Sequence, residues 1–345
     1  MSPLIMSMLI TGLATSTIIT MSSHHWLLAW LGLELNTMSI LPMIMKSGHP
    51  RSTEAATKYF LIQTMAAALI LFSSTMNAWQ TGQWTIMHTS NPILTTTITM
   101  ALMLKLGLAP MHAWYPEVLQ GSTLNTALII STWQKLAPLT LLYLMSPHLP
   151  TTITLIMGTA SALIGGWAGL NQTQTRKIMA LSSIAHMGWL IIALPLNPNL
   201  ATLTMMIYIV MTSTMFLLLN ITAMKTLTDM GTAWTQAPTM ITLTLITLMS
   251  LGGLPPLTGF MPKWLILNEL CTIKLLPTSM VLALASLPSL FFYARMTYLT
   301  TLTAPPNTTN TEHKWRFTTP INPILTTMAA TTTLLLPMMP LLTLT

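Results

Sequence analysis

The feature that most constrains this chain is a series of apolar runs, each about as long as a membrane is thick. About 20 helical residues, rising roughly 1.5 Å each, cross a hydrocarbon layer of about 30 Å. Charges, prolines or polar clusters bound each run. The sequence predicts eleven spans, at 3–21, 25–45, 56–76, 92–109, 124–145, 151–170, 178–195, 200–223, 238–257, 277–298 and 323–342.

The composition agrees with a chain that lies mostly in lipid. Of its 345 residues, 52% are hydrophobic and only 6% are charged, whereas a soluble domain carries about 25% charged residues. The net charge of +7 comes from scattered lysines and arginines that form no basic patch with aromatic residues, so we expect no nucleic acid partner. The predicted fold is all-α, a polytopic membrane protein of about eleven transmembrane helices in a single domain, residues 1–345.

The positive charges are distributed unevenly between the two sides of the predicted membrane. With the N-terminus inside, the opposite loops hold only Lys274, while Lys105, Lys135 and Lys263 fall at membrane depth. Basic residues concentrate on the inner side of membrane proteins, which favours eleven spans and an inner N-terminus. The inner loops and adjoining helix ends hold nine of the thirteen basic residues, namely Lys46, Arg51, Lys58, Arg176, Lys177, Lys225, Arg295, Lys314 and Arg316.

Two spans contain the same proline-broken pattern, Gly-Leu-x-Pro, at 107–110 and at 253–256. Proline lacks the backbone donor of a helical turn and clashes with the preceding turn, so both spans are predicted to be discontinuous helices. A lysine lies near each break. Transporters built from inverted repeats place broken helices at corresponding positions of their two halves, beside an ion site.

Four charged side chains are predicted to lie at membrane depth. Glu34 and Lys135 are central, Lys105 precedes the first break, and Lys263 follows the second. A charge at the bilayer centre costs about 2.5 to 3.5 kcal/mol on insertion scales, so these groups should face a protein interior. Lys263 has an alternative interpretation as a helix-end lysine that reaches the headgroups.

One acidic side chain and several basic side chains at a similar depth in the membrane favour a role in proton transfer. Burial disfavours the charged form of a lysine and a nearby carboxylate favours it, so the movement of one charge changes the proton affinity of the next site. Histidines could bridge the gaps. His112, between two prolines, and His186 are candidates for this role, although each is equally well explained as a structural histidine.

Other features receive simpler interpretations. Cys271 is the single cysteine; it excludes an internal disulfide and a multi-cysteine metal or iron–sulfur site, and we expect it to be buried. Glu54 and Lys58 are predicted to form a surface pair, and Glu117 to lie near the inner face. The glycines in 165–169 favour close helix packing over nucleotide binding, because no strand precedes them.

Four features of the chain together carry a resemblance to a known family. They are the Glu34 helix, the step from Lys105 to Lys135, the segment around His186 and the Leu-Pro-Pro-Leu-Thr-Gly-Phe break that ends at Phe260. In these features the chain resembles the antiporter-like membrane-arm subunits of respiratory complex I. The methionine-rich, lysine-poor composition is similar to that of proteins encoded in animal mitochondria. That family has more core helices than this chain has room for. Because Glu34 already lies in the second run, we expect the missing helices to be N-terminal.

The resemblance implies a set of functional properties. It implies a proton relay through Glu34, paired with Lys105, then Lys135 and Lys263, in a subunit of the proton-translocating NADH:ubiquinone oxidoreductase. No redox centre or cofactor is expected in this chain; NADH, FMN, iron–sulfur clusters and ubiquinone belong to other subunits. The implied partners are other membrane-arm subunits, further antiporter-like subunits among them, accessory subunits, and lipids such as cardiolipin. The implied location is the mitochondrial inner membrane, with the N-terminus on the matrix side and the C-terminus on the intermembrane-space side.

Three hypotheses follow from the sequence. In the first, electron transfer elsewhere perturbs Glu34 and Lys105, shifts the proton affinity of Lys135 and drives release by way of Lys263. In the second, the charges only lock neighbouring helices together in a structural subunit. In the third, the broken helices belong to a free-standing cation/proton antiporter.

Overall fold

The computed structural model describes residues 2–89, 91–235, 238–302 and 323–339. Within these ranges the regular structure is helical, apart from isolated β-bridges. The described chain forms two compact units, Met1–Ser161 and Ala162–Thr345, whose boundary falls inside one helix. The prediction of a single domain therefore stays a prediction.

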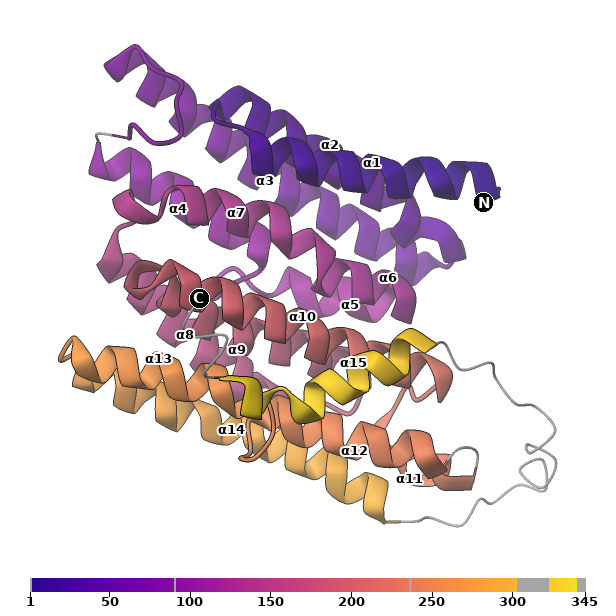
Figure 1. Cartoon of the computed structure of the whole chain (residues 1–345). Coiled ribbons are helices and arrows are strands. Elements are labelled where there is room, and N and C mark those ends of the chain that lie inside the picture. Colours follow the sequence, from indigo (N-terminus) through magenta and orange to yellow (C-terminus); the bar gives the residue numbers. More distant parts are fainter. Residues whose placement is uncertain (1, 90, 236–237, 303–322, 340–345) are drawn as a thin grey trace. The chain divides into compact units, whose positions relative to one another are not determined.

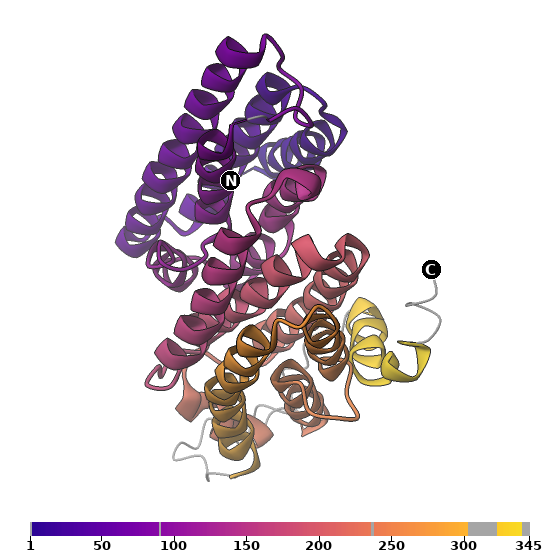
Figure 2. The same ribbon diagram turned by 90° about the vertical axis from the view of Figure 1, so that its left-hand side faces the viewer.

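The first unit contains long helices that run alongside one another (Figures 1 and 2). Helix α2 packs on α1 and α3, and α3 also packs on α4 and α5. The helices are α1 (Pro3–Ser22), α2 (Trp26–Ile44), α3 (Pro50–Thr81), α4 (Pro92–Leu106), α5 (Trp114–Gly121), α6 (Leu124–Ser131), the 3₁₀ turn η2 (Trp133–Lys135), α7 (Leu136–Leu144) and the start of α8 (Thr151–Gly169).

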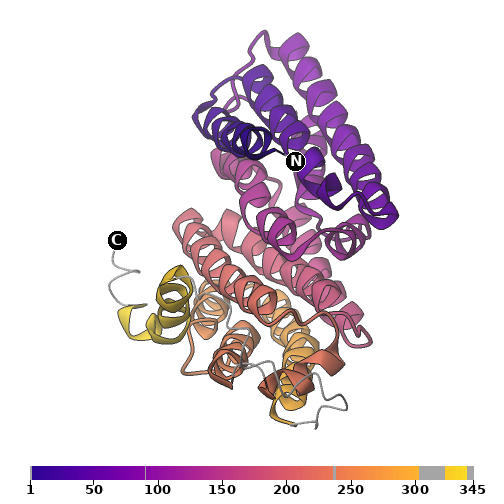
Figure 3. The ribbon, with the colours of Figure 1, turned by 90° about the vertical axis from the view of Figure 1, so that its right-hand side faces the viewer.

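The second unit packs α12 against α14 and α10, while α15 lies on α10 and α12 (Figure 3, yellow). Its helices are the end of α8, α9 (Thr175–Leu196), α10 (Pro198–Ile221), α11 (Leu227–Thr232), α12 (Pro238–Gly252), α13 (Phe260–Thr272), α14 (Leu276–Thr301) and α15 (Pro323–Leu334). Short 3₁₀ turns occupy Met45–Ser47, Ser146–His148, Ala233–Thr235 and Leu336–Met338.

Within the described residues, each predicted apolar run contains helix. Eight helical stretches of the described chain are long and apolar enough to cross a membrane, and α4 and α12 are shorter apolar helices. These two are the first halves of the broken spans. The exact number of spans therefore remains a prediction. The polar segment around Glu312 lies outside the described residues, as do the last residues of the run at 323–342.

The two predicted breaks have the same local structure. Gly107 and Gly253 adopt left-handed φ values of +74° and +77°, a region that favours glycine because it has no Cβ. The amides of Gly107 and Leu108 bond back to Leu104 and Met103 at 3.1 Å. At the second break, Gly253 and Leu254 repeat this pattern with Ser250 and Met249, at 2.9 and 3.3 Å. These are Schellman caps, and each ends one half-helix (Figure 1).

Glycines in the second unit allow close helix contacts, as predicted for the 165–169 cluster. A Cβ on Gly165 would lie 2.8 Å from the Leu181 carbonyl of α9, and one on Gly169 would lie 2.8 Å from the Phe292 ring of α14. The prediction for Cys271 is wrong, because this residue is exposed at the end of α13.

Candidate functional site: a polar cavity and a capped helix break

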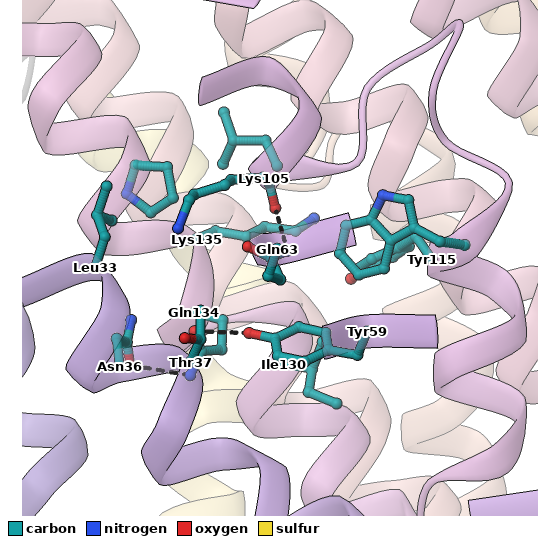
Figure 4. Close-up of a pocket in the computed structure, with 13 residues that line it drawn as sticks. Leu33, Asn36, Thr37, Tyr59, Gln63, Lys105, Tyr115, Ile130, Gln134 and Lys135 are labelled. Carbon is teal, nitrogen blue, oxygen red and sulfur yellow. Dashed lines mark hydrogen bonds between the residues drawn. The ribbon is translucent and has the colours of Figure 1, made fainter. Parts of the chain in front are cut away.

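Lys105 and Lys135 line the same internal cavity in the first unit (Figure 4). Their exposed fractions are only 7% and 3%. The cavity has a volume of about 20 Å³, which is room for about one water molecule. Polar side chains from four further positions share the lining, namely Asn36 and Thr37 of α2, Gln63 of α3 and Gln134 of η2. The structure therefore brings together two of the predicted lysines around a polar space.

Lys105 enters the cavity from the last turn of α4. Its Nζ is buried and has no hydrogen-bond partner among the described protein atoms. The Lys105 carbonyl accepts a bond of 3.4 Å from the Gln63 amide. A buried ammonium without a partner is costly, so this geometry suits either a bound water or the uncharged amine.

Lys135 enters the cavity from a helix break that the sequence analysis missed. Pro138 cannot donate to the Gln134 carbonyl and clashes with it, and the chain passes through the 3₁₀ turn η2 between α6 and α7. The residue that marks this break in the sequence is Pro138, three positions after Lys135. The Lys135 Nζ lies 5.0 Å from the centre of the Tyr115 ring, a favourable position for a cation.

Gln134 ties this unwound turn to two neighbouring helices. Its Nε2 donates to Asn36 Oδ1 at 3.0 Å, and its Oε1 accepts from the Tyr59 hydroxyl at 3.5 Å. Both bonds are visible in Figure 4. Asn36 and Tyr59 are each 2% exposed, so the turn that carries Lys135 is held by buried polar contacts.

Glu34 does not form the expected ion pair with Lys105. The Lys105 Nζ has no hydrogen-bond partner among the described atoms, and the Glu34 carboxylate instead accepts from the Thr37 hydroxyl at 3.1 Å. Glu34 is half-buried on α2. Its role in proton transfer remains a prediction.

Lys58 forms a larger surface cluster than predicted. It contacts Glu54 one turn earlier and Glu117 of α5, both at 2.6 Å. The predicted surface pair is confirmed. The contact with Glu117 also joins α3 to the half-helix that follows the first break.

Lys263 of the second unit turns back into the second break. Its Nζ donates to the Gly252 carbonyl at 2.8 Å, at the C-terminal end of α12, where the helix dipole favours a cation. This contact argues against the alternative in which Lys263 reaches for the headgroups. The two breaks thus place their lysines differently, on the half-helix before the first break and on the half-helix after the second.

The two histidine candidates lie in different surroundings. His112 is half-buried in the first break, where its Nδ1 lies 3.2 Å from the Pro110 carbonyl, and it does not line the cavity. His186 lies on α9 with its Nε2 3.4 Å from the Tyr293 hydroxyl. Its ring also lies 6.0 Å from that of Tyr208.

Broken helices that carry buried lysines beside a small polar cavity define a membrane subunit of the antiporter type. The profile of the family described as NADH:quinone oxidoreductase/Mrp antiporter matches residues 23–291, and that of NADH dehydrogenase subunit 2 C-terminus matches residues 290–343. The chain belongs to the family of NADH-ubiquinone oxidoreductase chain 2.

Two relatives and two solved structures illustrate this membership. The chain is 53% identical to NADH-ubiquinone oxidoreductase chain 2 of Xenopus laevis, over 92% of each chain, and 53% identical to that of Tetraodon nigroviridis, over 99% of this chain and 98% of the relative. A chain of respiratory complex I from Thermus thermophilus superposes with a TM-score of 0.85 at 24% identity, covering 99% of this chain and 78% of that chain. A chain of an archaeal membrane-bound sulfane sulfur reductase superposes with a TM-score of 0.81 at 16% identity, covering 97% and 74%. At these identities the two structural matches show the shared fold.

Proposed function

We propose that the buried charged residues of this chain relay protons across the membrane. The chain is a multi-pass mitochondrial membrane protein and a membrane-arm subunit of the proton-pumping NADH:ubiquinone oxidoreductase. Its direct partners are other membrane-arm subunits of that complex. The proposal concerns which of its residues carry the protons.

The observation that carries the proposal is the cavity shared by Lys105 and Lys135. A water bound there would have polar partners on several sides, which is the condition for a stable buried water. Because Lys105 Nζ has no protein partner among the described atoms, such a water would complete its hydrogen bonding. It would also provide the path for a proton between the two amines.

The electrostatics of the cavity support a sequential transfer. Two ammonium groups that face one small space repel each other, so the proton affinity of one falls when the other is charged. The Glu34 carboxylate favours a charge on Lys105, and a displacement of Glu34 would favour transfer to Lys135. In the second unit, Lys263 donates to the Gly252 carbonyl at the end of α12, and His186 would be a further base of the relay.

We also propose where the cofactors bind, what covers the lateral faces of the chain and on which side each terminus lies. Electron carriers and NADH are bound by other subunits, and this chain supplies proton transfer without a redox centre. Accessory subunits and lipids such as cardiolipin cover its lateral faces. The N-terminus lies on the matrix side and the C-terminus on the intermembrane-space side.

The proposal is tested by Lys135→Met in the assembled complex, reconstituted into vesicles. Methionine keeps most of the apolar stem and removes the proton-binding amine. We expect the ratio of protons pumped to electrons transferred to fall, while the complex still assembles. The matched control is Lys46→Met, at an exposed lysine outside the cavity, which should leave the ratio unchanged. An unchanged ratio in Lys135→Met, with assembly intact, would refute the role of Lys135.

A further inference from the structure

Helix α15 is much shorter than α10, the helix beside which it lies (Figure 1). As described, α15 contains 12 residues and α10 contains 24. At about 1.5 Å per residue, α15 is about 18 Å long, whereas the hydrocarbon layer is about 30 Å thick. Pro337 contributes to the early end of α15, because it cannot donate to the Thr333 carbonyl, and the chain turns there through Leu336–Met338.

The contacts of α15 fall on the second half of α10. Leu325 and Leu218 belong to one apolar cluster, and the Ser213 hydroxyl donates to Met328 Sδ at 3.9 Å. The two helices are therefore antiparallel, and α15 ends before it reaches the first half of α10. Along that half, α10 lines a groove of about 510 Å³ with a stripe at helical spacing, namely Asn199, Leu203, Met206, Ile207, Val210 and Met211.

The lining of this α10 groove suits hydrocarbon better than water. Each of its four threonine hydroxyls donates its one proton to a backbone carbonyl of the protein, at 2.7 to 2.8 Å; the donors are Thr202, Thr258, Thr331 and Thr332. The other polar side chain of the lining is that of Asn199, which is exposed in the first turn of α10. The groove thus has a polar amide at one end and an apolar length.

The depth of the groove corresponds to one leaflet of the membrane. From Asn199 to Met211, α10 rises about 18 Å, slightly more than half of a hydrocarbon layer of about 30 Å. Met206, in the middle of the stripe, is 67% exposed, so the groove is open at the side. A partner helix that crosses the membrane would need a groove of the full thickness, whereas this groove ends where α15 begins to cover α10.

We propose that the α10 groove binds one acyl chain of a membrane phospholipid, with the ester end at Asn199 and the end of the chain at Met211. The Asn199 amide donates to an ester carbonyl. The hydrocarbon covers the part of α10 that α15 leaves open. Apolar cavities stay dry and bind apolar molecules, and acyl chains are the apolar molecules that a membrane supplies.

The inner end of the groove reaches the second helix break. Thr258, in the connection between α12 and α13, lines the groove, and its hydroxyl ties this connection to the Thr332 carbonyl of α15 at 2.7 Å. Ser250 of α12 donates to Met211 Sδ at 3.3 Å. The bound acyl chain therefore lies against the contacts that hold the break, and it keeps water away from them on this side.

The test uses the assembled complex in phosphatidylcholine vesicles that contain a phosphatidylcholine probe with a diazirine at the end of one acyl chain. The complex is washed in detergent before irradiation, and labelled peptides are identified by mass spectrometry. We expect the label to persist at Met211 and Leu335, at the inner end of the groove, while the label averaged over the rest of the complex is lost. A probe with the diazirine next to the ester should label the peptide at Asn199 instead.

A variant that fills the groove supplies the second arm of the test. Val210→Trp places a large side chain in the stripe, and we expect it to lower the retained label about tenfold, because the exclusion of even a pair of methylene groups from an apolar site weakens binding by that factor. The matched control is Leu284→Trp, at an exposed position of α14 outside the groove, which should leave the retained label unchanged.

Three results would overturn the proposal. Equal loss of label from the groove and from the rest of the complex would mean contact with bulk lipid only. A groove without label even before the wash would mean that protein fills it. Full retention of the label in an assembled Val210→Trp complex would place the acyl chain elsewhere. The inference does not rest on the proton relay, so the labelling result stands whether or not Lys135→Met pumps normally.

Discussion

At the residue scale, the structure separates lysines that share a predicted depth by what their amines contact. Lys105 points into the cavity without a protein partner among the described atoms, Lys135 lies over an aromatic ring, and Lys263 caps a half-helix. Three chemically identical side chains therefore place their amines in three different surroundings. Such differences are needed for a directed sequence of transfers.

The cap made by Lys263 leads to a prediction for Gly253→Ala. An added Cβ would lie 2.9 Å from Lys263 Nζ, so the lysine side chain must shift, and we expect it to lose its bond to the Gly252 carbonyl. We expect the ratio of pumped protons to electrons to fall, together with a loss of stability of about 1 kcal/mol from the left-handed backbone.

The control for this change is Gly82→Ala. Gly82 has a similar φ of +71°, but its added Cβ would meet nothing within 4 Å. It should show the loss of stability, measured by thermal dissociation of the complex, with a normal pumping ratio. Equal pumping defects in the two variants would mean that backbone strain, and not Lys263, is responsible.

At the element scale, the function depends on helices that are interrupted. The breaks at Gly107 and Gly253 follow from glycine and proline in a repeated pattern, and they were predicted. The break before Lys135 follows from a single proline, Pro138, and was not predicted because one proline inside an apolar run usually only bends a helix. The unwound turn is also held by two bonds of Gln134, to Asn36 and to Tyr59, which join different helices.

Replacement of the proline in Pro138→Ala tests whether this interruption serves proton transfer. Alanine restores the donor to the Gln134 carbonyl and favours a continuous helix. The Lys135 amine should then turn away from the cavity, and the pumping ratio should fall although the helix itself gains stability. Pro42→Ala, inside the uninterrupted helix α2, is the control with no lysine to reorient. Normal pumping in Pro138→Ala would show that the break is not needed for proton transfer.

At the scale of the whole molecule, the distribution of charge predicts which loops face each side of the membrane. The predicted inner side holds Lys46, and the opposite side holds Lys274, which is close to the exposed Cys271. Insertion with basic loops inside is the general rule for short loops. Chemical labelling of the native Cys271 can therefore show on which side of the membrane this segment lies.

A membrane-impermeant thiol reagent tests this topology. Added from the intermembrane-space side of intact inner membranes, it should label Cys271. A Lys46→Cys variant in a Cys271→Ser background should be labelled only when the reagent reaches the matrix side. Labelling of both positions from one side would contradict the predicted topology, and with it an odd number of spans between them.

The sequence alone determined that the chain crosses a membrane many times, where two of its spans break, and that Lys105 and Lys135 are buried. These results follow from local physics, because the length of an apolar run, the cost of a buried charge and the backbone effects of glycine and proline do not depend on distant residues. The helix runs and the caps at Gly107 and Gly253 are confirmed for that reason.

Only the tertiary structure decided which buried groups meet. It placed Lys105 beside Lys135 around one cavity, left Glu34 bonded to Thr37 instead of paired with Lys105, and turned Lys263 onto Gly252. It also brought the Tyr293 hydroxyl of α14 to 3.4 Å from the His186 ring of α9. Contacts of this kind depend on how helices far apart in the sequence pack and rotate against one another. Hydrophobic periodicity could not supply that information here, because most of these helices are apolar on every side.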